Sequence, residues 1–548
     1  MPSAKGPKAA YGSLVRRSHI PLMNWLSGCS RAAKRYRVMV MKNYPGEHRN
    51  RPPGKGENAP HPLGGRDEGF ETTYFYKDKP SISPLNASVN KARSVTITID
   101  KSTRAPLAEL SPWCLSRIKK HLTFENPEFI EANRMGRSTW SIPREIRAYE
   151  LEGGLIILPR GFTRQLISIL QKAGCTYKIE DQRRALPEAD YKFTGTLKDF
   201  QTEAVNAMLS RDFGTLSSPT GSGKTVMALA IIEARKQPTL IIVHSKELVN
   251  QWVERIGTFL GIPCNEIGII GNGKKTIGPR ITIGIINSIH KVSSEIREHF
   301  GHVVVDECHR VPARTFTEGL KNFDARYVLG LSATPWRRDK LSRLIYWNVG
   351  DVVHKIDQDT LMDSGDVLRA EVIIRETDFR TSFDPSEQYS LMLSELTENQ
   401  KRNALIVQDV AQEAEEGSGV CLVLTDRKAH VEALIVMLQE KGLNAKGLHG
   451  DFSNRERQAV VENLNSGAVK ALVATGQLIG EGFDCKELST LFLACPIRFD
   501  GRLLQYLGRV LRPAPGKDKA RVFDYIDKNI GVLENSARAR QQVYMRAS

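Results

Sequence analysis

A glycine-rich segment, set between a short apolar run and a helix pattern, constrains this chain more than any other feature. The apolar approach covers 213–216, the eight residues 218–225 read Ser-Pro-Thr-Gly-Ser-Gly-Lys-Thr, and 226–232 continue as an apolar helix pattern. A strand, a glycine-rich turn and a helix start in this order place backbone N–H groups where the helix dipole favours an anion. Gly221 and Gly223 let the backbone approach that anion closely. The segment therefore predicts a phosphate-binding loop.

Residue types within this loop match a nucleoside triphosphate and its metal ion. Lys224 would reach the β- and γ-phosphates, and the Thr225 hydroxyl would hold Mg²⁺. The rest of the predicted cradle is Ser218, Thr220, Gly221, Ser222 and Gly223. We therefore expect ATP and Mg²⁺ as cofactors, and we expect a metal-binding carboxylate further along the chain. A second glycine-lysine segment at 271–275 lacks a following helix pattern, so it is predicted to be a turn.

The expected carboxylate follows a second apolar run. Residues 301–305 are rich in valine and lead directly into Asp306 and Glu307. A strand this apolar fits a parallel sheet covered on both faces, where ligands bind at the carboxyl ends of strands. We expect Asp306 to bind the Mg²⁺ held by Thr225, and Glu307 to orient or deprotonate the attacking water. The alternative, an exposed strand end, is disfavoured by the phosphate-binding loop upstream.

Further motifs, in the same order, resemble those of superfamily 2 helicases and translocases. They are Asp306-Glu307-Cys308-His309, 331–335, 425–427 with 448–450, 474–476 with 480–484, and the Gln-x-x-Gly-Arg-x-x-Arg pattern at 505–512. The match covers about residues 190–535, and the segment ahead of it is similar in position and pattern to the N-terminal domains of XPB-like and phage UvsW-type helicases. Ser218 stands where the general loop pattern has glycine, a departure that is tolerated in helicases.

The resemblance implies an α/β fold with two tandem RecA-like lobes, each a doubly wound parallel sheet. It implies that Arg509 and Arg512 reach the γ-phosphate from the second lobe, an effect worth about 10³–10⁵ in rate in well-studied nucleotidases. An exposed basic helix face is the alternative. Further implied roles are adenine recognition by Gln201, nucleotide contact by Asp484, nucleic-acid phosphate contacts by Ser245, Ser288 and Thr475, and coupling of hydrolysis to movement by Ser332, Thr334, Gly482 and Gln505.

Composition and pattern divide the chain into four predicted regions. They are a basic, disordered arm at 1–90, a small α+β domain at 91–185, the ATP-binding lobe at 186–365 and the second lobe at 366–548. In the small domain we expect a strand at 95–99, helices at 112–121 and 162–173, and a turn at 122–127. It is interpreted either as a structural cap or as a DNA-contacting domain, with Arg134, Arg137, Lys178 and Arg183 as candidate contacts.

The arm carries most of the excess charge. Residues 1–60 contain 12 Lys and Arg and 2 acids, and so hold +10 of the net charge of +16. One interpretation is an arm that adds salt-dependent affinity for nucleic-acid phosphates. Two alternatives are an organelle-targeting peptide and a passive tail, or sequence upstream of a natural start at Met39 or Met41.

Cysteine spacing and hydropathy bear on metal binding, on the redox compartment and on membrane insertion. The eight cysteines include no Cys-x-x-Cys pair, which argues against a zinc site and for a reducing compartment. No apolar run approaches the roughly 20 residues of a membrane span. We expect a monomeric cytoplasmic protein, nucleoid-associated or viral. The predicted function is an ATP-dependent helicase or translocase on single-stranded, forked or branched DNA. The alternatives are an RNA-directed motor, a restriction-system motor subunit and an ATP-switched annealing protein.

Overall fold

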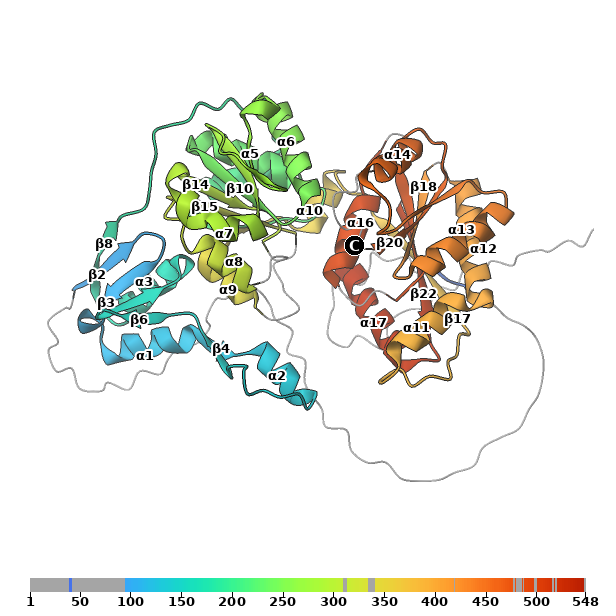
Figure 1. Cartoon of the computed structure of the whole chain (residues 1–548), viewed down its shortest axis with the longest axis horizontal. Helices are drawn as coiled ribbons and strands as arrows, with labels where there is room; N and C mark the ends of the chain where they lie inside the picture. Colours follow the sequence, from blue (N-terminus) through green and yellow to red (C-terminus); the bar gives the residue numbers. More distant parts are fainter. Residues whose placement is uncertain are drawn as a thin grey trace, which may run out of the picture.

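A computed structural model describes residues 39–41, 94–308, 313–333, 341–417, 419–476, 479, 485, 487–496, 500–514, 517 and 520–546. The predicted arm at 1–90 lies outside the described residues, apart from the short strand β1 (Met39–Met41). The described residues form three larger sheets and one two-stranded sheet. Figure 1 shows two α/β lobes side by side, with a smaller domain below the first lobe.

The first lobe is built on an eight-stranded sheet in the order β12-β11-β13-β10-β14-β15-β9-β16. Its strands are β9 (Phe213–Ser217), β10 (Thr239–Val243), β11 (Gly268–Gly271), β12 (Lys274–Lys275), β13 (Ile281–Ile285), β14 (His302–Val305), β15 (Tyr327–Ser332) and β16 (Val352–Lys355). All pairs are parallel except the hairpin β11–β12, which confirms the turn predicted at 271–275. Every residue of β10 and β14 is buried, as a sheet covered on both faces requires.

Helices pack on both faces of this sheet. They are α4 (Asp199–Leu209), α5 (Lys224–Arg235), α6 (Lys246–Leu260), α7 (Ile286–Ile296), α8 (Ala313–Leu320), α9 (Ser342–Val349) and α10 (Gln358–Asp363). Helix α6 begins after Ser245, whose hydroxyl accepts a hydrogen bond from the backbone N–H of Leu248 (3.4 Å). Ser245 is therefore the N-cap of α6, a position at which serine is favoured.

The second lobe is a seven-stranded, fully parallel sheet in the order β1-β17-β22-β21-β18-β20-β19. Its further strands are β17 (Ala370–Thr377), β18 (Val420–Thr425), β19 (Ala445–Leu448), β20 (Ala471–Thr475), β21 (Leu488–Leu493) and β22 (Ala520–Asp527). Its helices are α11 (Tyr389–Glu398), α12 (Gln400–Glu416), α13 (Lys428–Glu440), α14 (Asn454–Asn465), α16 (Asp500–Val510) and α17 (Gly531–Arg546). The two parallel sheets confirm the predicted fold class.

The N-terminal domain, 94–181, has a five-stranded sheet in the order β6-β7-β3-β2-β8. Its elements are β2 (Ser94–Ile99), β3 (Thr103–Pro106), β6 (Glu150–Glu152), β7 (Leu155–Leu158), β8 (Thr176–Asp181), α1 (Pro112–His121) and α3 (Thr163–Lys172). Between α1 and β6 lie the two-stranded sheet of β4 (Thr123–Glu125) and β5 (Glu145–Arg147), and helix α2 (Pro127–Arg134).

The predicted strand at 95–99 and the helices at 112–121 and 162–173 are confirmed, but the turn predicted at 122–127 is wrong. Phe124 pairs with Ile146 across β4 and β5, a long-range contact that no local pattern reveals. Asn126 and Pro127 instead mark the start of α2, because the Asn126 side chain accepts a hydrogen bond from the backbone N–H of Glu128 (3.0 Å).

Close contacts fix this domain to the first lobe. Trp347 of α9 packs within the N-terminal domain's core, with its ring 5.8 Å from that of Phe124. Arg183 bridges Asp181 (2.7 Å) and Asp212 of the first lobe (2.8 Å), and Lys178 pairs with Glu180 (3.0 Å). These two cations therefore serve ion pairs within the fold. Of the four candidate contacts predicted for this domain, Arg134 and Arg137 are the exposed, unpaired ones among the described residues.

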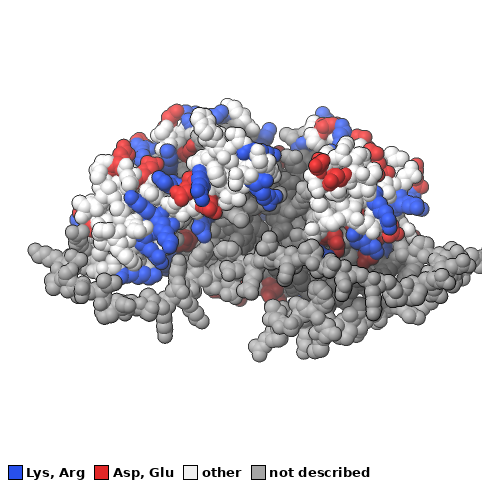
Figure 2. All heavy atoms as spheres, turned by 90° about the horizontal axis from the view of Figure 1, so that it is seen from below, with Lys and Arg blue, Asp and Glu red and all other residues white. Residues whose placement is uncertain are grey.

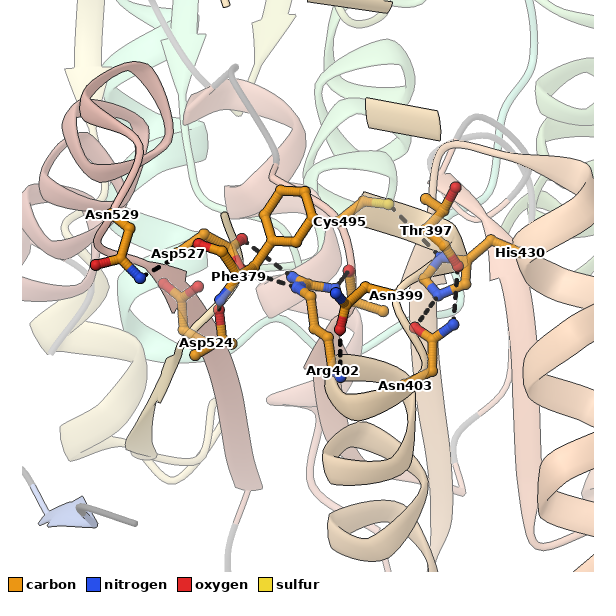
Figure 3. A network of polar contacts seen from close by, with 12 residues as sticks. Phe379, Thr397, Asn399, Arg402, Asn403, His430, Cys495, Asp524, Asp527 and Asn529 are labelled. Atoms are coloured by element: carbon orange, nitrogen blue, oxygen red, sulfur yellow. Dashed lines mark hydrogen bonds and ion pairs between the residues drawn. The ribbon is translucent and has the colours of Figure 1, made fainter. Parts of the chain in front are cut away.

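A buried polar network joins four strand ends of the second lobe (Figure 3). Arg402 pairs with Asp527 at the end of β22 (2.9 Å) and donates to the carbonyl of Ala494 after β21 (2.6 Å). Asp527 also accepts from Thr377 at the end of β17. His430 contacts Thr425 at the end of β18 (2.8 Å). The network therefore ties the carboxyl edge of this sheet together.

Replacing Arg402 with Ala should destabilise the second lobe by about 3–5 kcal/mol, because it leaves the buried carboxylate of Asp527 without its partner. The matched control is Arg538→Ala, since Arg538 pairs with Glu534 at 2.8 Å but is 68% exposed. Such exposed pairs contribute about 0–1 kcal/mol. Urea unfolding of both variants would measure the difference, and equal losses would contradict this role for the network.

The same network makes stability depend on pH. Burial, followed by the charge of Arg402, lowers the pKa of His430 from 6.5 to about 3. The unfolded chain therefore takes up a proton near pH 6.5 that the folded lobe rejects, so stability falls as the pH drops below 6.5. Between pH 7 and pH 5 the loss should be about 2 kcal/mol. His430→Gln should remove that part of the pH dependence in urea unfolding, and an unchanged dependence would contradict the assignment.

Candidate nucleotide and nucleic-acid site

Three of the predicted motifs meet at one edge of the first lobe's sheet. Strands β14, β15 and β9 are neighbours, and Ser217 is in register with Ser332. The backbone N–H of Ser218 donates to the carbonyl of Ser332 (2.9 Å), and that of Cys308 donates to the carbonyl of Leu331 (3.1 Å). The phosphate-binding loop, the acidic pair and the Ser-Ala-Thr segment are thus joined at the carboxyl ends of adjacent strands.

The phosphate-binding loop has the backbone that the sequence predicts. Gly221 and Gly223 have φ values of 94° and 80°, a region that favours glycine, and α5 begins directly after Gly223. The Lys224 ammonium donates to the carbonyl of Ser218 (3.1 Å) and lies 3.8 Å from a Glu307 carboxylate oxygen. Ser222 donates to the carbonyl of Pro219 (2.8 Å) and also contacts Ser218.

Gln201 is buried against this loop and is not an exposed surface glutamine. Its carboxamide oxygen accepts from the backbone N–H of Lys198 (3.0 Å), and its amide donates to the carbonyl of Ser222 (2.9 Å). A Cβ atom on Gly223 would lie 2.5 Å from that amide nitrogen, so the two residues are in close contact. Both ends of the amide therefore bond within the protein here, and adenine recognition by Gln201 stays a prediction.

Asp306 is a buried carboxylate at the end of β14. One oxygen accepts from the Trp252 indole N–H (2.9 Å), and the other accepts from the backbone N–H of Glu307 (2.9 Å). Burial, reinforced by the negative charge of Glu307, raises the pKa of Asp306 from 3.8 to about 6. Trp252 opposes that rise and orients the carboxylate. Trp252 lies on α6, 54 residues before Asp306, so sequence spacing gave no sign of this role.

Glu307 adopts an uncommon backbone conformation, with φ of 45° in a residue other than glycine. Such conformations cost about 1–3 kcal/mol and are concentrated at functional sites. The Glu307 carboxylate accepts from the backbone N–H of Ala333 (3.4 Å). The acidic pair is therefore bonded directly to the Ser-Ala-Thr segment, whose Ser332 is buried beside it.

The donor set fits a divalent cation. Two adjacent carboxylates, Asp306 and Glu307, meet at a strand end, and a bound cation would neutralise their negative charge. Thr225 lies in the first turn of α5, next to the lysine that approaches Glu307. Oxygen ligands of this kind suit Mg²⁺, which commonly binds through one or two carboxylates plus substrate phosphates.

Helix α16 of the second lobe packs on the phosphate-binding loop. A Cβ atom on Gly508 would lie 2.5 Å from the Cβ of Thr220, so only glycine permits this approach. The helix is also tied to the chain between the lobes, since the backbone N–H of Leu368 donates to the carbonyl of Leu511 (2.7 Å). Arg509 directly follows the contact, and Arg512 lies two residues beyond the end of α16.

Tyr506 fixes the other side of α16. Its hydroxyl donates to the carbonyl of Gly476 (2.7 Å), directly after Thr475 at the end of β20. The arginine-bearing helix and the predicted nucleic-acid contact at Thr475 are therefore linked by one buried tyrosine. The sequence motif contains this tyrosine, but only the structure shows its partner.

The predicted nucleic-acid contacts lie at carboxyl ends of strands. Ser245 follows β10, and Ser288 follows the neighbouring strand β13. Ser288 lies in the first turn of α7, because β13 stops at Ile285. Thr475 ends β20 in the second lobe. Thr334, Gly482, Asp484 and the side chain of Gln505 lie outside the described part of the structure.

Comparison with known proteins identifies the family. Residues 194–337 match the family described as "Type III restriction enzyme, res subunit", and 400–514 match "Helicase conserved C-terminal domain". The chain is 30% identical over 395 residues to putative helicase 161L of Invertebrate iridescent virus 6, covering 66% of this chain and 84% of that protein. It is 26% identical over 382 residues to DNA 3'-5' translocase XPB2 of Sulfurisphaera tokodaii, covering 63% and 84%.

The crystal structure of T4 UvsW aligns over 83% of this chain and 98% of that protein, at 19% identity and a TM-score of 0.39. From the sequence matches, the chain belongs to the superfamily 2 helicases, with an XPB protein among its relatives. It is accordingly an ATP-hydrolysing enzyme. Within the described residues, no helix is both long and apolar enough to cross a membrane.

The Gly508 contact predicts a sensitive position. Gly508→Ala should force α16 away from Thr220, and ATP turnover should fall about tenfold to a hundredfold, since a shift of about 1 Å at a reacting site can cost that much. Gly531→Ala is the control, because an added Cβ there meets nothing within 4 Å. Steady-state ATPase assays would compare the two, and wild-type turnover by Gly508→Ala would contradict the packing argument.

Proposed function

We propose that the chain is an ATP-driven motor that unwinds or remodels single-stranded, forked or branched DNA. The observation that carries the proposal is the packing of α16 on the phosphate-binding loop, with Gly508 against Thr220. It brings the segment that bears Arg509 and Arg512 to the nucleotide-binding edge of the first lobe. The proposed units are those predicted from the sequence: 91–185, 186–365 and 366–548.

In the proposed reaction, each motif has one task. Lys224 binds the β- and γ-phosphates in the cradle of 218–225, while Gln201 and Asp484 contact the nucleotide. Thr225 and Asp306 hold Mg²⁺, which neutralises charge on the phosphates when bound. Glu307 orients the attacking water and takes its proton. Arg509 and Arg512 stabilise charge on the γ-phosphoryl group as the lobes close.

Movement on DNA follows from contacts in both lobes. Ser245 and Ser288 in the first lobe, and Thr475 in the second, would donate to backbone phosphates, which positions a strand without reading its sequence. Ser332, Thr334, Gly482 and Gln505 would pass closure of the nucleotide site to these contacts. The bond from Ala333 to Glu307 supports such coupling, because it joins the hydrolysis site to that segment. Alternate closing and opening would then shift the grip along the strand.

Two substitutions test the hydrolysis site. Glu307→Gln should lower ATP turnover at least about a hundredfold while nucleotide still binds, because the general base is lost. Lys224→Ala should lower turnover to the same extent and also weaken nucleotide binding. Lys275→Ala is the control, since Lys275 follows the other glycine-rich turn but pairs with Glu295 on the surface. Normal turnover by Glu307→Gln would remove the proposed chemistry.

A substrate panel tests the DNA assignment. ATP turnover should be stimulated by single-stranded, forked or four-way DNA more than by matched RNA, and the affinity should fall steeply with salt. Stronger stimulation by RNA would instead identify an RNA-directed motor of the same architecture. Strand-displacement and annealing assays on a fork would separate unwinding from ATP-switched annealing, and stimulation by no nucleic acid would count against any motor.

A further inference from the structure

Among the residues that the structure describes, the most exposed of the large hydrophobic side chains lies in the N-terminal domain, on a projection formed by residues 127–144. Trp140 is 98% exposed, and Met135 and Ile130 on the same projection are each 47% exposed. Figure 1 shows this projection, which carries α2, extending below the rest of the domain. A tryptophan held in solvent has no packing role in the fold, so its exposure points to a partner.

The segment that carries Trp140 is basic. Residues 132–144 contain three arginines, Arg134, Arg137 and Arg144, and no acidic residue, whereas Glu128 and Glu131 lie earlier in α2. All three are exposed, and none forms an ion pair or side-chain hydrogen bond within the part of the chain that the structure describes. In contrast, Lys178 and Arg147 of the same domain, and Arg183 directly after it, each have a carboxylate partner. Cations left unpaired beside an exposed aromatic ring favour an anionic partner that carries flat rings.

The projection is held in one shape by its own hydrogen bonds. The buried Asn126 clamps its base, since its backbone N–H donates to the carbonyl of Arg144 (2.9 Å) and its side-chain amide donates to the carbonyl of Pro143 (2.9 Å). The backbone N–H of Arg137 donates to the carbonyl of Ala132 (2.9 Å), and that of Ile142 to the carbonyl of Thr139 (3.1 Å). A preformed loop loses less conformational entropy on binding than a disordered one.

Helix α1 of the same domain also carries an exposed tryptophan close to basic residues. Trp113 is 51% exposed on α1, and Arg117 and Lys120 follow it at spacings that share one helix face. Figure 1 shows α1, β4 and α2 following one another along the lower edge of the domain. Figure 2 looks at the molecule from that side and shows Lys and Arg side chains gathered over this part of it.

A groove of about 600 Å³ completes the projection, lined by Glu125, Phe129, Ile130, Asn133, Arg134 and Arg144. The lining therefore combines two apolar side chains, Phe129 and Ile130, with two of the unpaired arginines. Nucleic-acid bases stack on aromatic and apolar surfaces while arginines bind the phosphates between them, whatever the base sequence. The geometry matches a strand whose bases are unpaired, because paired bases hide their faces within the duplex.

We infer that the lower edge of the N-terminal domain is a binding platform for single-stranded nucleic acid, with Trp140 and Trp113 stacking on bases and Arg134, Arg137 and Arg144 binding phosphates. This inference rests on the proposed function in one respect, namely that the strand is the motor's own substrate. Because the domain is fixed to the first lobe through Trp347 and Arg183, a strand gripped here keeps a constant position relative to that lobe.

The test measures binding of a fluorescein-labelled oligothymidylate to the full chain without ATP, as a function of salt. Trp140→Ala and Trp113→Ala should each weaken binding about fivefold or more, because a stacked base is lost, but should leave the salt dependence unchanged. The triple variant Arg134→Gln, Arg137→Gln, Arg144→Gln should reduce the slope of log K against log salt by about 2, since each phosphate contact to a single strand contributes about 0.7.

Two controls lie in the same domain but off the platform. Leu151→Ala removes a 47%-exposed apolar side chain from β6, and Lys178→Gln removes a cation that pairs with Glu180. Both should bind as the wild type does. Circular dichroism and melting curves should be unchanged in all variants, because every altered side chain is exposed. Equal weakening by the controls, or no weakening by Trp140→Ala, would overturn the platform.

The outcomes separate this inference from the motor proposal. In the ATPase assay, Trp140→Ala should raise the oligonucleotide concentration needed for half-maximal stimulation and leave turnover at saturation unchanged. If the wild type is stimulated but Trp140→Ala behaves identically, the platform is wrong and the motor stands. If Trp140→Ala weakens binding but no nucleic acid stimulates the wild type, the platform stands and the motor fails. An oligouridylate arm shows whether the platform prefers DNA or RNA.

Discussion

The contact of Gly508 with Thr220 is the interaction on which the rest of this enzyme depends. Each lobe has its own sheet, and α16 of the second lobe packs on the phosphate-binding loop of the first. An added methyl group at Gly508 would fall 2.5 Å from the Thr220 side chain. The second lobe therefore approaches the first as closely as backbone allows, which is what a site shared between two domains requires.

Both sides of this contact are braced by buried polar groups. In the first lobe, Trp252 holds Asp306 and Ala333 holds Glu307. In the second, Tyr506 ties α16 to the end of β20, and the Arg402 network ties together the ends of four strands. Buried polar networks of this kind are costly when partly satisfied and rigid when complete. Rigid lobes can transmit a small movement at the nucleotide to the nucleic acid without dissipating it.

The N-terminal domain is attached to the first lobe by the same kind of buried contact. Arg183 and Trp347 join it to the first lobe, so it moves with the nucleotide site. Lys178 and Arg147 form ion pairs within the domain, whereas Arg134, Arg137 and Arg144 are unpaired among the described residues and lie in the segment that carries Trp140. The net charge of the chain does not show which cations are paired. Lys178 and Arg134 each add one positive charge, but only Lys178 pairs with a carboxylate among the described residues.

The sequence by itself determined the local parts of this protein. The glycines at 221 and 223 and the valine run before Asp306 act through neighbouring residues, so pattern alone predicted the loop and the strand. The two parallel sheets were implied by the family resemblance that the ordered helicase motifs carry. Tertiary structure decided everything that joins distant segments: the β4–β5 pairing, the bonding of Gln201 to the loop, the Trp252–Asp306 bond, and which arginines are paired. These contacts form between residues far apart in the chain, where spacing carries no information about which side chains will meet.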